Sequence, residues 1–154
     1  LLWDTEKYPQ WVPHCISAYE LEEQNDRSVY YYASSAFPWP LQDRDLIAYS
    51  TFSQSDQDQT ITIRTTATPA YPYPDKGMIR VRQLEAIWIL KPLKTGKTKV
   101  TYTLFTDPGG NVPAWGVNKF MDKGPIQTIE AMRELAKQEP YINAKWEAIV
   151  DPNN

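Results

Sequence analysis

Cysteine is almost absent from this sequence of 154 residues, which contains only Cys15. A single thiol excludes an internal disulfide framework and a cysteine-cluster metal site. Long apolar runs are also absent, because the longest, residues 86–90, is far shorter than the roughly 18–20 residues that cross a bilayer. No transmembrane segment is therefore expected, and any contact with a membrane should be peripheral.

An excess of basic charge is absent as well. The 16 Lys and Arg residues are balanced by 19 Asp and Glu residues, giving a net charge of -3, and no basic stripe is visible. Nucleic acid is therefore not expected as a partner. With 42% hydrophobic and 23% charged residues, the composition is typical of one soluble globular domain covering 1–154. The segment Leu1-Leu2-Trp3-Asp4 shows no secretory signal.

Catalytic motifs are also missing. The sequence has no phosphate-binding loop, nucleophile elbow or metal-ligand spacing. His14 and Cys15 are adjacent, but neighbouring side chains on an extended segment diverge, and no third group is positioned to orient the pair. The carboxylates of Asp56 and Asp58 fit turn formation. We therefore expect no catalytic residues, no metal and no cofactor.

What the sequence does contain is a long series of β signals. Short runs rich in Val, Ile, Thr and Tyr alternate with Pro, Gly, Asp and Asn between residues 17 and 107. Because the connections are mostly short, the runs predict sequential hairpins of one antiparallel sheet. The expected strands are 17–24, 28–36, 44–53, 58–68, 79–91 and 98–106.

The pattern changes after Gly109-Gly110. Apolar residues recur every three positions from Ile126 to Leu135, which predicts one apolar face of a helix over 113–138. Gly124-Pro125 should kink or break that helix, because Pro lacks the backbone N–H. A curved antiparallel sheet wrapped around a long C-terminal α-helix is an α+β arrangement, and the helix must cover one face of the sheet.

Four segments resemble a known family. They are residues 37–45 (FPWPLQDRD), 77–81 (GMIRV) with 88–92 (WILKP), 107–118 (DPGGNVPAWGVN), and 2–4 (LWD) followed by Trp11. Their order and spacing are similar to those of StAR-related lipid-transfer (START) domains, nearest in motif to the phosphatidylcholine transfer protein subgroup. The resemblance covers nearly the whole chain, although START domains usually also have an N-terminal helix and first strands that this sequence lacks.

The resemblance implies the helix-grip fold and the binding, and transfer, of a lipid or other hydrophobic ligand in an internal cavity, without catalysis or a cofactor. It also implies that the last helix and a loop move at a transiently contacted membrane surface. Two alternatives stay open at this point. One is a polyketide cyclase/aromatase-like helix-grip enzyme, which would need a titratable residue with a perturbed pKa in its pocket. The other is a ligand-sensing regulatory domain.

The residues expected to bind the ligand come from alternation along the strands and from the start of the helix. In several START proteins an Arg six residues beyond the Arg of the Arg-Asp dipeptide contacts the lipid head group, but Ser50 occupies this position here. Recognition of a charged head group by that route is therefore not expected. The expected ligand-binding residues are Tyr30, Tyr32, Tyr49, Ile63, Arg82, Tyr102, Leu104, Trp115, Val117, Phe120 and Met121.

Overall fold

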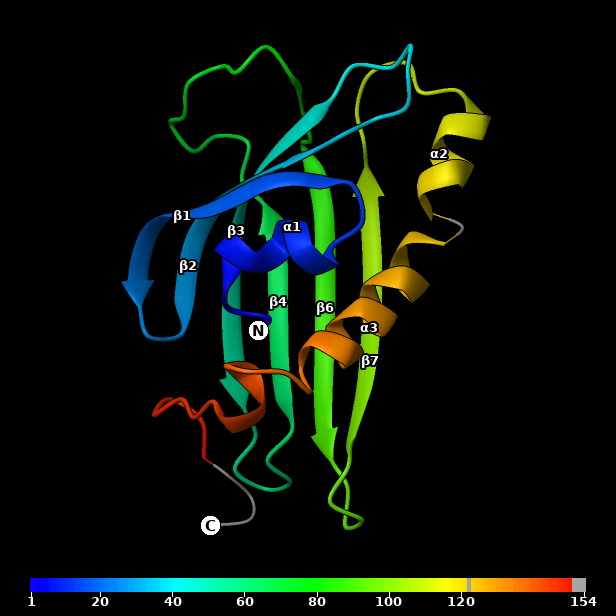
Figure 1. Cartoon of the computed structure of the whole chain (residues 1–154). Helices are drawn as coiled ribbons and strands as arrows, with labels where there is room; N and C mark the ends of the chain where they lie inside the picture. The colour runs from blue at the N-terminus through cyan, green and yellow to red at the C-terminus, as the bar shows by residue number, and fades with distance from the viewer. Residues whose placement is uncertain (122, 151–154) are drawn as a thin grey trace.

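The computed structural model describes residues 1–121 and 123–150, without the side chains of 119–121 (Figure 1). Within those residues seven strands form one sheet in the order β1-β2-β3-β4-β6-β7, with β5 paired to β3. Neighbours along this path are antiparallel. The strands are β1 (Cys15–Asn25), β2 (Ser28–Ser35), β3 (Arg44–Gln54), β4 (Ile61–Ala67), β5 (Ile79–Arg80), β6 (Gln83–Pro92) and β7 (Thr98–Asp107).

The sheet therefore has the antiparallel hairpin order that the sequence predicts, with one correction. The expected strand 79–91 is divided into β5 and β6 at Val81 and Arg82, and β5 runs parallel to β3. After β4 ends at Ala67, the chain leaves the sheet through loop 68–78 and returns beside the first residues of β3. β5 thus occupies the place beside β3 that β4 does not reach.

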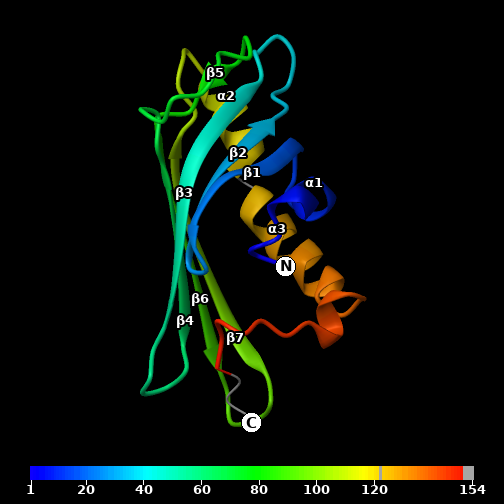
Figure 2. The ribbon, with the colours of Figure 1, turned by 90° about the vertical axis from the view of Figure 1, so that its left-hand side faces the viewer.

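The described residues form three α-helices, α1 (Tyr8–Trp11), α2 (Ala114–Met121) and α3 (Gly124–Leu135), and two short 3-10 helices, Thr5–Lys7 and Tyr141–Asn143. The single long helix expected over 113–138 is thus two helices. The expected kink or break is therefore a break, and Pro125 lies in the first turn of α3, where its missing N–H costs nothing. In Figures 1 and 2 the helices lie on the same side of the sheet. We call this covered side the inner face and the opposite side the outer face.

A compact cluster fills one end of the inner face. Trp11 from α1 and Met132 from α3 are buried against Phe52, Ile63 and Trp88 of the sheet. The cluster joins the short N-terminal segment and α3 to the central strands. Burying side chains of this size contributes about 1.5–3 kcal/mol each, so this cluster anchors the helices to the sheet.

Candidate functional site

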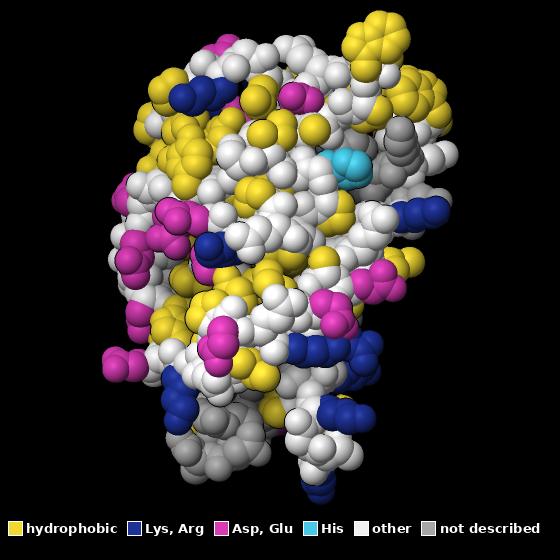
Figure 3. All heavy atoms as spheres, viewed as in Figure 1, with side chains coloured by type: hydrophobic (Ala, Val, Ile, Leu, Met, Phe, Trp, Pro, Cys, Tyr) yellow, Lys and Arg dark blue, Asp and Glu magenta, His cyan; other side chains and the backbone are white. Residues whose placement is uncertain are grey.

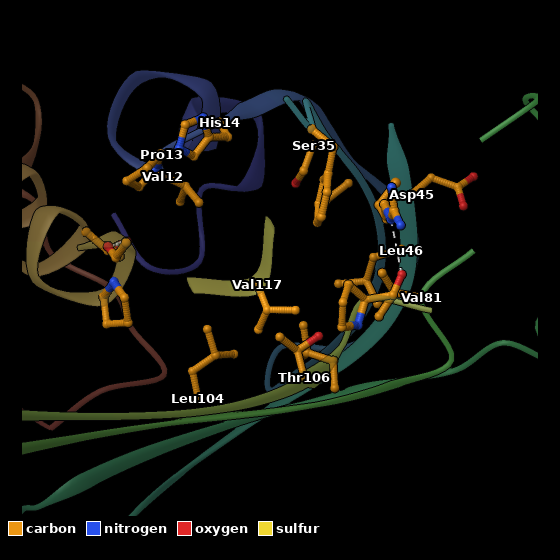
Figure 4. A pocket seen from close by; sticks show the side chains of 18 of the residues that line it. Val12, Pro13, His14, Ser35, Asp45, Leu46, Val81, Leu104, Thr106 and Val117 are labelled. Atoms are coloured by element: carbon orange, nitrogen blue, oxygen red, sulfur yellow. Dashed lines mark hydrogen bonds between the residues drawn. The ribbon is translucent and has the colours of Figure 1, made fainter. Parts of the chain in front are cut away.

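The other end of the inner face holds a cavity of about 190 Å³ (Figure 4). The sheet supplies one wall, α2 and α3 supply a second, and the turn between α1 and β1 supplies a third. In Figure 4, Val12, Pro13 and His14 lie across the cavity from Asp45, Leu46 and Val81. The sheet-side lining is Ala33, Ser35, Phe37, Arg44, Asp45, Leu46, Val81, Leu84, Tyr102, Leu104, Thr106 and Pro108, and the lining from the helices is Val117, Gly124, Pro125 and Thr128.

The lining changes in polarity along the strands. Leu46, Leu84 and Leu104 line the cavity from three different strands, and Leu84 lies directly across from Thr106 in the β6–β7 pairing. Two residues further along β7 lies Thr106, and Ser35 lies at the corresponding end of β2. A ligand with an apolar body and one polar group would therefore find leucine side chains along the cavity and the hydroxyl groups of Ser35 and Thr106 toward this end of the strands, which we call the polar end.

Arg44 closes the polar end. Its side chain is buried, and its guanidinium donates to the carbonyl oxygens of Pro108 (3.2 Å), Gly109 (3.1 Å) and Gln42. The same group lies over the ring of Phe37, 4.1 Å from its centre. Burial lowers the pKa of Arg44, although an Arg side chain stays charged in proteins. Arg44 therefore joins loop 36–43 to the turn that leads into α2.

Asp45, the next residue, points to the opposite face of the strand, as alternation requires. Its carboxylate accepts hydrogen bonds from Nε (2.6 Å) and Nη2 (3.0 Å) of Arg80 on β5. The paired geometry is bidentate, and the hydrogen bonds to Asp45 raise the pKa of Arg80. The pair fixes β5 beside β3 and holds Val81 against the cavity.

Loop 36–43 and α2 flank the cavity through Phe37 and Val117 and lie side by side in Figures 1 and 2, and we call this part of the molecule the mouth. Gly116 on α2 is buried, and a Cβ atom at this position would lie 2.9 Å from Cδ1 of Leu41 in the loop. Glycine thus permits α2 to pack closely on the loop. The close packing of Gly116 on Leu41 joins α2 to the loop, and the hydrogen bonds of Arg44 join the loop to the turn before α2.

Of the residues expected to bind the ligand, Tyr102, Leu104 and Val117 line the cavity. Burial raises the pKa of Tyr102 to about 12, so its hydroxyl stays protonated at neutral pH. Ile63 shares the inner face but is packed into the cluster with Trp88. The side chains of Phe120 and Met121 lie outside the described residues.

Tyr30, Tyr32 and Tyr49 lie on the outer face and not on the cavity side, where the sequence analysis placed them. Their rings are covered by loop 68–78. Tyr71 of this loop packs on Tyr30 with 4.9 Å between ring centres, and Tyr73 stacks on Tyr32 at 5.1 Å. The tyrosines and the proline-rich loop thus form a second, smaller hydrophobic layer. The expected positions fail because alternation separates two faces but does not say which face the helices cover.

Arg82 and Trp115 also lie away from the cavity lining. Arg82 is exposed in the irregular link between β5 and β6. Trp115 is on α2, but half of its surface faces solvent. Val117, two residues further along α2, lines the cavity instead.

Sequence reasoning missed several of the lining residues, including Leu46, Leu84 and the turn Val12–Pro13. Leu46 and Leu84 could have been found from Leu104, because β-strand alternation together with the register places them on the same face. Val12 and Pro13 carry no such signal. They reach the cavity because α1 ends at Trp11 and the chain turns back over the sheet.

Cys15 is not an activated nucleophile. Burial raises the pKa of its thiol to about 11. A pKa higher by about two corresponds to a roughly 100-fold smaller thiolate fraction near neutral pH, and the thiolate is the reactive form. We expect alkylation of the folded protein by iodoacetamide at pH 8 to be about 100-fold slower than in urea, as followed by mass spectrometry, and to accelerate as the pH rises toward 11. Equal rates in both states would contradict this prediction.

A curved sheet with helices packed on one face around an apolar cavity defines the helix-grip class of domains. The model of the START domain family matches residues 1–140. The chain is 33% identical over 129 residues to the Uncharacterized protein PA1579 of Pseudomonas aeruginosa, covering 84% of this chain and 63% of that protein. It is 26% identical to the bovine phosphatidylcholine transfer protein over 113 residues, covering 71% and 52% of the two chains.

A solved structure gives the same result. The STAR-related lipid transfer protein of Xanthomonas axonopodis (fragment 25–204) superposes with a TM-score of 0.79 at 31% identity, covering 89% of this chain and 76% of that one. The chain belongs to the START domain family and has its helix-grip fold. It spans less than two thirds of the length of the curated relatives it matches.

Proposed function

We propose that this domain reversibly binds one hydrophobic molecule, a lipid or a compound of similar polarity, in the cavity between the sheet, α2 and α3. The observation that carries the proposal is the apolar lining supplied by Leu46, Leu84 and Leu104, with the hydroxyl groups of Ser35 and Thr106 toward one end. The names of two related proteins support the proposal. The Xanthomonas axonopodis protein is called a STAR-related lipid transfer protein, and the bovine protein is called phosphatidylcholine transfer protein. Each methylene moved from water into such a lining contributes about 0.8 kcal/mol.

Binding without chemistry fits the titratable groups of the site. Asp45 is the one acidic residue among the described residues that line the cavity, and its carboxylate points away from the cavity to Arg80. Tyr102 keeps its proton, and Arg44 is bound to backbone carbonyls. Asp45, Tyr102 and Arg44 are thus held in structural roles and not placed for the proton exchange that a cyclase-type mechanism requires; His14 is the other titratable side chain in the lining. We therefore propose a carrier or binding domain and not an enzyme.

Filling the cavity tests the proposal. Leu104→Trp would place a larger side chain in the middle of the lining, so we expect the affinity for any ligand recovered with the protein to fall by at least about 100-fold, or roughly 3 kcal/mol. The matched control is Thr103→Trp, because Thr103 is exposed and lies on the other face of the same strand. Native mass spectrometry of the purified proteins would detect the ligand. Equal loading of both variants would refute the cavity as the binding site.

The mouth of the cavity also has the features of a membrane-contacting surface. Trp39 in loop 36–43 is 90% exposed, and Trp115 on α2 is 50% exposed. Hydrophobic side chains protrude at this end of the molecule in Figure 3. No helix in the described residues is long and apolar enough to span a bilayer. Tryptophan prefers the membrane–water interface, so we propose that the mouth touches a membrane while the ligand enters or leaves.

Removing one of these side chains tests this step separately from binding. We expect Trp39→Ala to slow the transfer of a fluorescent lipid between vesicles several-fold, because less apolar surface can enter the interface, while the affinity for the ligand in solution stays unchanged. Phe105→Ala is the control, since Phe105 is 61% exposed but lies on the outer face of β7. If both variants transfer lipid equally fast, contact through the mouth is ruled out.

A further inference from the structure

The cavity occupies only part of the inner face. Its volume of about 190 Å³ is below the roughly 300–1,000 Å³ typical of pockets that enclose drug-sized ligands. On β7 its lining runs from Thr106 at the polar end to Tyr102 at the other. With a rise of about 3.4 Å per residue, these two positions lie about 14 Å apart. The strands continue beyond Tyr102, but the cavity does not.

A row of five aromatic side chains crosses the inner face where the cavity stops. Tyr102 on β7 stacks on Trp88 on β6, with 4.0 Å between ring centres and 16° between ring planes. Trp88 meets Trp11 of α1 edge to face at 6.3 Å. Tyr8, also on α1, packs edge to face on Trp11 at 5.3 Å and on Tyr31 of β2 at 5.7 Å.

The row spans the inner face from β7 to β2. Strands β3, β4 and β6 lie between these two strands, and α1 bridges the space above them. Behind the row the inner face is filled. Phe52 packs against Trp3 at 5.4 Å and against Trp146 at 4.6 Å, and Ile63 and Met132 complete the cluster. A ligand that enters at the mouth therefore meets aromatic rings before it reaches these residues.

We propose that this aromatic row is a length stop, and that Trp88 and Tyr102 determine which ligands fit. The inference rests on the proposed binding function and adds the class of ligand. The site takes a molecule with one polar group and a single short chain or compact ring system. The polar group lies toward Ser35 and Thr106, and the apolar end rests on Tyr102. A lipid with two long chains does not fit between the mouth and the row.

A series of fatty acids tests the length stop, measured by isothermal titration calorimetry with octanoate, decanoate, palmitate and stearate. Each methylene that enters the cavity should raise the affinity about fourfold. We expect the affinity of the unmodified protein to rise at the short end of the series and to stop rising before palmitate. A rise that continues through stearate would overturn the length stop while leaving the binding function intact. Absence of binding by every acid would overturn both.

Three variants locate the stop. Tyr102→Ala and Trp88→Leu open the row, so both should extend the rise in affinity to longer acids, with palmitate gaining at least about tenfold over the unmodified protein. Trp146→Leu is the matched control, because Trp146 packs behind the row and its removal should leave the chain-length profile unchanged. If Trp88→Leu does not fold, Tyr102→Ala still decides the question, since Tyr102 is only half-buried and lies outside the central cluster. An unchanged profile in a folded Tyr102→Ala protein would refute the proposal.

Discussion

Replacing Arg80 with Ala is expected to lower the free energy of unfolding by about 3–5 kcal/mol, because it leaves the carboxylate of Asp45 buried without its partner. Asp45 is only 2% exposed, and Arg80 is its bidentate donor. Equilibrium denaturation in urea would measure the change. The cavity should also be affected, since the pair holds Val81 against the lining.

Arg64→Ala is the matched control for this experiment. Arg64 also pairs with a carboxylate, that of Glu85, but both side chains are about half exposed. Exposed pairs typically contribute between about 0 and 1 kcal/mol, so the control should lose little stability. Combining Arg80→Ala with Asp45→Asn should restore part of the loss, because the buried charge is then removed. If the two single Arg variants are equally stable, the buried pair is not a main determinant of the fold.

Introducing an Arg at position 50 is expected to be similarly damaging. The resemblance to START domains suggests this position for a head-group contact, but Ser50 is buried, its hydroxyl is hydrogen-bonded to Thr65, and the hydroxyl of Tyr31 contacts both. No carboxylate is among these contacts. Ser50→Arg would place an unpaired charge there, which costs several kcal/mol, so we expect loss of stability and no improved binding of phosphatidylcholine.

Ser53→Arg provides the comparison, because Ser53 is exposed on the same strand and faces the other way. It should change the free energy of unfolding by no more than about 0.5 kcal/mol. Thermal unfolding followed by circular dichroism would distinguish the two. A stable Ser50→Arg protein that binds phosphatidylcholine more tightly would show that the hydroxyl cluster can open to admit a charged head group.

Family motifs predict the positions of Arg44 and Asp45 but not the surroundings of Ser50. The Arg44-Asp45 dipeptide is a family motif at the start of β3. In the structure Arg44 links loop 36–43 to the turn before α2, and Asp45 holds β5 through Arg80. Whether residue 50 reaches a ligand depends on where α1 lies, since Tyr8 and Trp11 cover this part of the sheet. The four-residue helix has no periodicity that a sequence pattern could detect.

The sequence by itself determined the family and the antiparallel order of β1, β2, β3, β4, β6 and β7, but not the short parallel strand β5, because alternation, turn residues and four spaced motifs are local properties. Only the tertiary structure decided which face of each strand meets the helices. Tyr30 and Tyr31 are chemically identical neighbours, yet Tyr31 packs under α1 while Tyr30 is covered by Tyr71. Two covered faces both select apolar and aromatic residues, so the composition of β2 does not separate them. The inner face is fixed by which segments, distant in the sequence, find room to pack on each side.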